Sequence, residues 1–156
     1  MDNKLKTGNM KDKNLLYFVL AAVLVVILDQ VTKYFVLKYI VVGASVQLFG
    51  SVLVLSHIVN TGAGFFIFKG FNSALSFFSV FVIGMIIYLY DKIPKEKMPQ
   101  LFFGLILGGA IGNLIDRLMY SSVIDFIDFG FWPAFNVADM ALSIAVVGLI
   151  FYFWKK

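Results

Sequence analysis

Two aspartates near the carboxyl end of the chain have a spacing that allows them to act together. Asp125 lies in VIDF at 123–126, Asp139 ends FNVAD at 135–139, and a short aromatic loop joins the two stretches. Two neighbouring carboxylates resist ionising together, so they share a proton and titrate as a pair. One can then deprotonate a water molecule while the other protonates or polarises a peptide carbonyl. By position alone, Asp128 competes with Asp125 for this role.

Other hydrolytic arrangements fit the sequence less well. The chain has no Cys and a single His, His57, which is isolated in an apolar stretch, so a Ser-His-Asp arrangement would depend on it. A Ser-Lys dyad would need an outward Ser near Lys33, Lys38 or Lys69, and no motif indicates one. Without Cys, and with one His, the sequence offers no Cys-based or two-His metal motif.

The elements that position these groups are membrane spans. Of the 156 residues 61% are hydrophobic and only 14% charged, and the mean hydropathy is +0.92. Four apolar runs approach the roughly 20 residues that cross a bilayer, so we predict an all-α membrane protein, a single integral-membrane domain over 1–156. The predicted spans are 14–38, 71–90, 100–120 and 135–154. Despite a net charge of +4, no basic helix or aromatic-basic patch indicates nucleic-acid binding.

The basic residues predict the orientation of the spans. Nine of the 13 lie on one side: Lys4, Lys6, Lys11, Lys13, Lys92, Lys95, Lys97, Lys155 and Lys156. By the positive-inside rule both termini are cytoplasmic, and the stretches 39–70 and 121–134 face outward. Five acids gather on the outer side: Asp29, Asp116, Asp125, Asp128 and Asp139. Carboxylates kept at a membrane interface usually serve a function.

The outer segment 41–70 is predicted to form two or three short strands rather than a span. Glycines interrupt it repeatedly, and 46–59 is rich in β-branched and apolar residues. An apolar sheet outside the membrane would lie against the interface. There it could hold an extended peptide by strand addition or cover a site.

Polar residues in the spans fall on single helical faces. Asp29 and Lys33 are four residues apart, which allows an ion pair that anchors the first helix or a catalytic role. In the fourth span, Asn136 is placed to cap the helix and shares a face with Asp139, three residues later.

The third span carries a packing seam that ends in a polar cluster. Glycine recurs every fourth residue, at Gly104, Gly108 and Gly112. Such a row lets a neighbouring helix approach closely. Asn113, Asp116 and Arg117 share nearly the same face, where Asp116 either neutralises Arg117 or caps a nearby backbone end.

Five motifs occur in order along the chain and together resemble those of the bacterial lipoprotein signal peptidase (signal peptidase II) family. They are DQVTK at 29–33, NTGAGF at 60–65, GGAIGNLIDR at 108–117, VIDF at 123–126 and FNVAD at 135–139. The resemblance covers essentially the whole chain. It departs from the family pattern at Gly64, where Ala is frequent, and in the short connection between 125 and 139.

The resemblance implies an aspartic endopeptidase of the bacterial inner membrane, with its site near the outer interface. It would cleave the signal peptide from diacylglyceryl-modified prolipoproteins before the lipidated Cys, with Asp125 and Asp139 as the catalytic dyad. The residues implied to bind substrate or support the dyad are Asn60, Gly62, Asn113, Arg117, Asn136 and Ala138. Asp29, Lys33 and Asp116 are implied to be structural. The same resemblance implies a β-cradle from about 40–60 and a loop that closes over the site.

The implied mechanism is direct attack by water, with no covalent intermediate, metal or cofactor. Arg117, with Asn113 or Asn136, would orient the peptide and its developing charge. The implied partners are lipid-modified prolipoproteins and membrane lipids, with no obligate protein partner and a monomeric enzyme.

Two other functional classes remain at this stage. A four-span transporter or channel subunit coupled to protons or cations would explain intramembrane acids, but not their gathering on one face. A structural membrane subunit would predict that Asp-to-Asn changes affect assembly alone. Peptide hydrolysis without a gradient separates the peptidase from the transporter.

Overall fold

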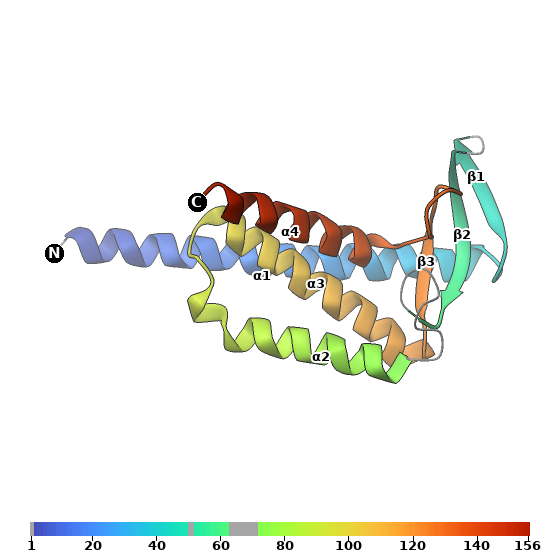
Figure 1. The fold of residues 1–156 in the computed structure, drawn as a ribbon, viewed down its shortest axis with the longest axis horizontal. Coiled ribbons are helices and arrows are strands. Elements are labelled where there is room, and N and C mark those ends of the chain that lie inside the picture. Colours follow the sequence, from blue (N-terminus) through green and yellow to red (C-terminus); the bar gives the residue numbers. More distant parts are fainter. Residues whose placement is uncertain (1, 50–51, 63–71) are drawn as a thin grey trace.

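The computed structural model describes residues 2–49, 52–62 and 72–156, with side chains of the first helix described from Asn14 onward. Helices run alongside one another and an antiparallel sheet closes one end, opposite both termini (Figure 1). The helices are α1 (Asp2–Tyr39), α2 (Asn72–Tyr88), α3 (Lys97–Tyr120) and α4 (Val137–Trp154), with a short 3-10 turn, η2 (Tyr90–Lys92), after α2. The strands are β1 (Ser45–Phe49), β2 (Leu53–Asn60) and β3 (Val123–Asp128).

The helices confirm the predicted all-α membrane fold, with shifted ends. Three have the length and composition to cross a membrane: α1 over Asn14–Tyr39, α3 and α4. The second span is shorter than predicted, because α2 ends at Tyr88 and its 17 residues rise only about 26 Å. The fourth begins at Val137 rather than 135, since Asn136 caps it and Phe135 bridges to β3. Residue 71 lies outside the described residues.

Glycines of α3 allow the close helix packing that the sequence predicted. A Cβ on Gly108 would lie 2.6 Å from the carbonyl oxygen of Ala22, and one on Gly112 would lie 2.6 Å from Oδ2 of Asp29. The row therefore faces α1. On a neighbouring face, a Cβ on Gly109 would lie 2.7 Å from the carbonyl oxygen of Ala138 in α4. Helix α3 is thus held between α1 and α4.

The sheet has the order β1-β2-β3, with both pairs antiparallel. Two of its strands, β1 and β2, come from the outer segment 41–70 as predicted, and the third, β3, lies between α3 and α4. Its pairing places Asp125 opposite Ile58 and Val123 opposite Asn60. The VIDF motif at 123–126 lies within this strand. Positions 50–51 and 63–70 of the outer segment lie outside the described residues.

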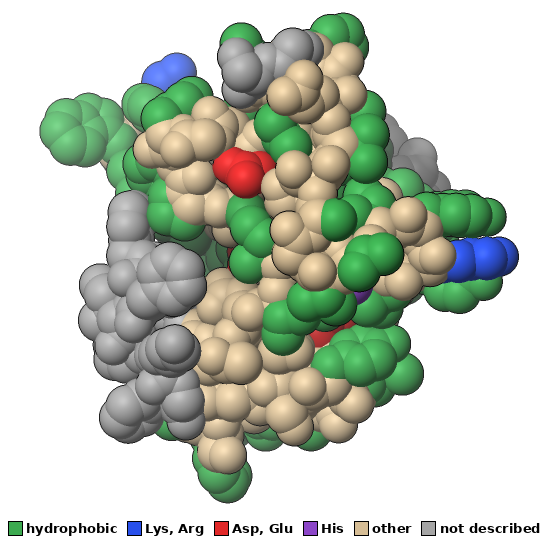
Figure 2. Space-filling model, turned by 90° about the vertical axis from the view of Figure 1, so that its right-hand side faces the viewer, with side chains coloured by type: hydrophobic (Ala, Val, Ile, Leu, Met, Phe, Trp, Pro, Cys, Tyr) green, Lys and Arg blue, Asp and Glu red, His purple; other side chains and the backbone are tan. Residues whose placement is uncertain are grey.

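At the end of the molecule formed by the sheet, hydrophobic side chains lie among backbone and uncharged polar atoms, with few charged side chains (Figure 2). Every residue of β1 is exposed, including Val46, Leu48 and Phe49. His57 of β2 is buried, and its Nδ1 lies 2.7 Å from the carbonyl oxygen of Ile40, just after α1. This contact ties the sheet to the first helix.

Candidate active site

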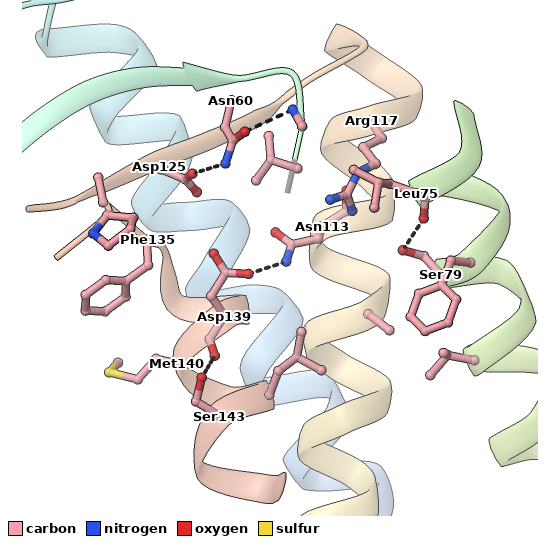
Figure 3. A pocket seen from close by; sticks show the side chains of 18 of the residues that line it. Asn60, Leu75, Ser79, Asn113, Arg117, Asp125, Phe135, Asp139, Met140 and Ser143 are labelled. Atoms are coloured by element: carbon pink, nitrogen blue, oxygen red, sulfur yellow. Dashed lines mark hydrogen bonds between the residues drawn. The ribbon is translucent and has the colours of Figure 1, made fainter. Parts of the chain in front are cut away.

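A cavity of about 580 Å³ lies where α2, α3 and α4 meet the sheet. Its lining includes Asp125 and Asp139, with Asn113 and Arg117 from α3, Asn60 from β2, and the apolar Leu75 of α2. Figure 3 shows the two aspartates pointing into the same space, with the α3 side chains across from them. The structure therefore brings together the two acids that the sequence singled out.

The side-chain alternation of β3 directs Asp125 into the cavity. Successive residues of a strand point to opposite faces, and the flanking Ile124 and Phe126 pack with Val36 of α1 in a buried cluster. Asp125 consequently faces the other way, although only 2% of it is exposed. Asp128 does not join it: its carboxylate accepts hydrogen bonds from Ser56 Oγ and from the Gly130 N–H.

The start of α4 places Asp139. As predicted, Asn136 is the N-cap, and its side-chain oxygen accepts the main-chain N–H of Asp139 at 2.9 Å. Asp139 is the third residue of the helix. Its Oδ1 accepts a hydrogen bond of 2.7 Å from Nδ2 of Asn113.

Two carboxamides donate to Asp125, one to each oxygen. Nδ2 of Asn136 lies 2.8 Å from Oδ1, and Nδ2 of Asn60 lies 2.8 Å from Oδ2. The oxygen of Asn60 accepts the main-chain N–H of Gly62, so the amide nitrogen of Asn60 faces the carboxylate of Asp125. Gly62 thus acts through its backbone.

The environment of Asp125 favours its protonated form. Burial, followed by the charge of Asp139, raises the pKa of Asp125 from 3.8 to about 7. The hydrogen bonds from Asn60 and Asn136 and the charge of Lys33 act in the opposite direction. A carboxyl group with a pKa near neutrality can hold or release a proton at physiological pH, as acid-base chemistry requires.

Behind the cavity lies a buried ion cluster. Lys33 Nζ lies 2.7 Å from Asp29 Oδ2, which confirms the predicted i, i+4 pair, and 2.8 Å from Asp116 Oδ2. Among the described residues the ion pair of Asp116 is therefore with Lys33, and Asp116 makes no ion pair with Arg117, the first of the two alternatives left open by the sequence. Asp116 does bind a backbone end, since it accepts the N–H of Ile124.

The cluster also holds the start of α4. Oδ1 of Asp29 accepts the N–H of Ala138 at 2.9 Å. Ala138 is fully buried against α3 and does not line the cavity. Sequence reasoning missed Gln30, whose Nε2 donates to Asp29, Asp116 and the Gly112 carbonyl. Its place beside Asp29 in the DQVTK motif was the one signal that could have indicated it.

Arg117 lines the cavity and has a hydrogen-bond donor without a partner in the described ranges. Its Nη1 makes a long contact of 3.4 Å with the carbonyl oxygen of Asn113. Its buried Nε has no hydrogen-bond partner within the described ranges. No group of three or more His, Cys, Asp or Glu suited to a metal ion occurs in that part of the chain either.

Comparison with known proteins decides the family. The family model described as signal peptidase (SPase) II matches residues 21–155. The chain belongs to the signal peptidase II family. A lipoprotein signal peptidase of Halothermothrix orenii is 37% identical over 137 residues, covering 88% of this chain and 94% of that protein. One from Brevibacillus brevis is 42% identical over 135 residues, covering 83% and 89%.

Solved structures agree with this membership of the signal peptidase II family. A bacterial membrane enzyme solved by the in meso method at 2.3 Å resolution superposes with a TM-score of 0.84 and 32% identity, covering 88% of this chain and 87% of that one. Another, solved at 1.9 Å, gives a TM-score of 0.81 and 33% identity over 89% and 93%. The protein is therefore a multi-pass bacterial membrane enzyme, an aspartic peptidase that removes signal peptides from prolipoproteins. The transporter and structural-subunit alternatives are set aside.

Proposed function

We propose that Asp125 and Asp139 are the catalytic dyad of this signal peptidase. The observation that carries the proposal is that both acids line one cavity and that each accepts a hydrogen bond from a carboxamide. The raised pKa of Asp125, caused by burial and by the charge of Asp139, supports a shared proton.

Hydrolysis follows from a dyad that holds one proton. The ionised carboxylate takes a proton from water as the water oxygen bonds to the carbonyl carbon of the scissile peptide. The protonated carboxyl supports the carbonyl oxygen. When the C–N bond breaks, a proton passes to the leaving amine and the dyad keeps one. Arg117 and the amide of Asn113 orient the peptide and its developing charge.

The proposed substrate is a prolipoprotein that carries a diacylglyceryl group on the Cys following the cleaved bond. The mixed lining of the cavity supports this, because acids lie at its sheet end while apolar residues of α2 and α4, Leu75, Phe78, Val82, Leu142 and Ile144, line the remainder. Such a site accepts a peptide and an acyl chain together.

We place the enzyme in the inner membrane with cytoplasmic termini. The lysines near both termini and in the α2–α3 connection support this orientation. The sheet and dyad then lie at the outer interface, where a lipid-anchored substrate arrives through the bilayer. The proposed partners are prolipoproteins and membrane lipids, with the enzyme acting as a monomer and binding no nucleic acid.

The test is a gel-shift assay of purified protein in detergent, with precursor offered with and without its diacylglyceryl group. We expect wild-type protein to cleave the lipidated precursor alone. Asp125→Asn and Asp139→Asn are each expected to reduce turnover by about 100-fold or more. Asp128→Asn is the matched control, because this nearby acid contacts Ser56 and Gly130 and does not line the cavity.

Thermal unfolding of each variant shows whether the protein is folded. A folded Asp125→Asn or Asp139→Asn variant with near wild-type cleavage would refute the dyad. Equal cleavage of both precursors would refute the requirement for the lipid.

A further inference from the structure

Lys33 is a buried cation that lies behind the cavity and does not line it. Its ammonium has three N–H donors and no acceptor. Three oxygens surround it: Asp29 Oδ2 at 2.7 Å, Asp116 Oδ2 at 2.8 Å and Asn113 Oδ1 at 3.3 Å. Two of these oxygens, on Asp29 and Asn113, accept hydrogen bonds, and Asp116 adds an ion pair. Asn113 is also the residue that contacts Asp139.

The contact with Lys33 helps to determine which end of the Asn113 amide faces Asp139. A carboxamide has an acceptor end and a donor end. Because Lys33 only donates, it faces Oδ1, and Nδ2 is left to donate to Asp139 at 2.7 Å. The reverse orientation would place the amide N–H groups against a cation and an oxygen against a carboxyl group.

The other two amides at the dyad are oriented by main-chain groups. The Asn60 oxygen accepts the Gly62 N–H, and the Asn136 oxygen accepts the Asp139 N–H. Asn113 Oδ1 also accepts Nδ2 of Asn136 at 3.2 Å, and the same amide nitrogen, which has two N–H donors, contacts Asp125 at 2.8 Å. Two donors therefore orient the Asn113 amide, and Lys33 is the charged one.

We propose that Lys33 is a positioning residue for Asp139, acting through Asn113 and without touching substrate. The inference rests on the proposed function, which assigns Asp139 to the dyad. Asp29 and Asp116 hold the ammonium in place and also bind the Ala138 and Ile124 N–H groups. The cluster therefore holds Lys33 in a fixed position relative to both segments of chain that carry the acids.

A double-mutant cycle between Lys33 and Asn113 tests the inference. Lys33→Met, Asn113→Ala and the double variant are compared for kcat and KM on lipidated precursor. We expect Lys33→Met to lower kcat roughly 10- to 100-fold with little change in KM. In the Asn113→Ala background the same change should alter kcat little, because the route to Asp139 is already removed. Lys38→Met is the control, since Lys38 is exposed on the same helix and packs over Tyr34 and Tyr39.

If Lys33→Met lowers kcat by the same factor in both backgrounds, Lys33 does not act through Asn113 and the proposal is overturned. If Lys33→Met does not fold, the cycle is repeated in an Asp116→Asn background. In that background Lys33→Met leaves Asp29 as the one charged residue of the cluster, so the net charge stays at −1, as in the wild type.

Asn113→Asp gives a test that does not alter Lys33. It keeps an acceptor for the ammonium but loses the N–H donor, so kcat should fall at least as far as in Asn113→Ala. Retained activity would overturn the assigned amide orientation. Activity in folded Asp125→Asn or Asp139→Asn protein would instead refute the proposed function. If the dyad variants are inactive but Lys33→Met lowers kcat by the same factor in both backgrounds, the proposed function stands and only the role of Lys33 is refuted.

Discussion

Asn136 donates from Nδ2 to Oδ1 of Asp125 at 2.8 Å while the oxygen of the same carboxamide caps α4. One side chain therefore fixes the strand that carries one acid against the helix that carries the other. Because the cap occupies the oxygen, the nitrogen is directed to the carboxylate. The same amide thus caps the helix and supports the proposed dyad.

These two uses can be separated by substitution. Asn136→Ser keeps a capping oxygen but loses the donor to Asp125, whereas Asn136→Ala loses both. We expect both variants to lose about 10- to 100-fold in kcat, the worth of a hydrogen bond to a charged group. Only Asn136→Ala should also lose about 1 kcal/mol of unfolding free energy. Thermal unfolding and steady-state kinetics of the two variants test this prediction. A fully active Asn136→Ser variant would contradict it.

The pKa of Asp125 predicts an alkaline limit to activity. Burial and the charge of Asp139 raise this pKa to about 7, so the pair loses its shared proton as the pH rises through about 7, and kcat/KM should fall there. The hydrogen bond from Asn60 lowers the pKa. Asn60→Ala should consequently move the alkaline limb to higher pH. A pH profile whose alkaline limb moves to lower pH in this variant would contradict the assignment.

Gly112 is predicted to be intolerant of a side chain. A Cβ there would lie 2.6 Å from Oδ2 of Asp29, the oxygen that binds Lys33. Gly112→Ala should cost about 1–3 kcal/mol of stability through overpacking and should also reduce activity. Gly84→Ala in α2 is the matched control, because a Cβ at that position would have no neighbouring atom within 4 Å among the described residues. Equal melting temperatures for the two variants in detergent would contradict the close approach.

We predict that Arg117 lowers the stability of the substrate-free enzyme and strengthens substrate binding. Its buried Nε has no partner within the described ranges, and an unsatisfied buried donor is destabilising. Arg117→Met should raise the melting temperature of the enzyme without substrate. It should also raise KM, since the guanidinium lines the cavity. A variant with a lower melting temperature and unchanged KM would show that the arginine is structural.

The membrane fold was predictable because its signals are local. Length and apolar composition indicate the spans, and the four-residue glycine row indicates the α3 seam. The third strand was not assigned to the sheet, since pairing between β2 and β3 joins segments more than 60 residues apart and strand pairing leaves no local pattern. The end of α2 was missed because apolar residues continue past Tyr88.

The ion cluster shows the same division between local and distant signals. The spacing of Asp29 and Lys33 within one helix predicts their pair. For Asp116 the sequence left open a pair with its neighbour Arg117 or a contact with a backbone end, but it did not indicate the ion pair with Lys33 across the α1–α3 interface. Lys33 is buried on α1, and no pattern within α3 indicates which helix packs against Asp116. The roles of the individual site residues stay predictions until the variants are measured.

The sheet that joins β2 to β3 has a consequence for how the enzyme is made. Asn60 comes from the connection of the first helical hairpin, α1 with α2, and both acids come from the second hairpin, α3 with α4. A nascent chain with only its first hairpin inserted carries neither acid. The second hairpin alone lacks the lysine and the amide that the first supplies. With the proposed dyad, we therefore expect proteolytic activity only after the two hairpins dock, so a chain with one hairpin inserted should be inactive.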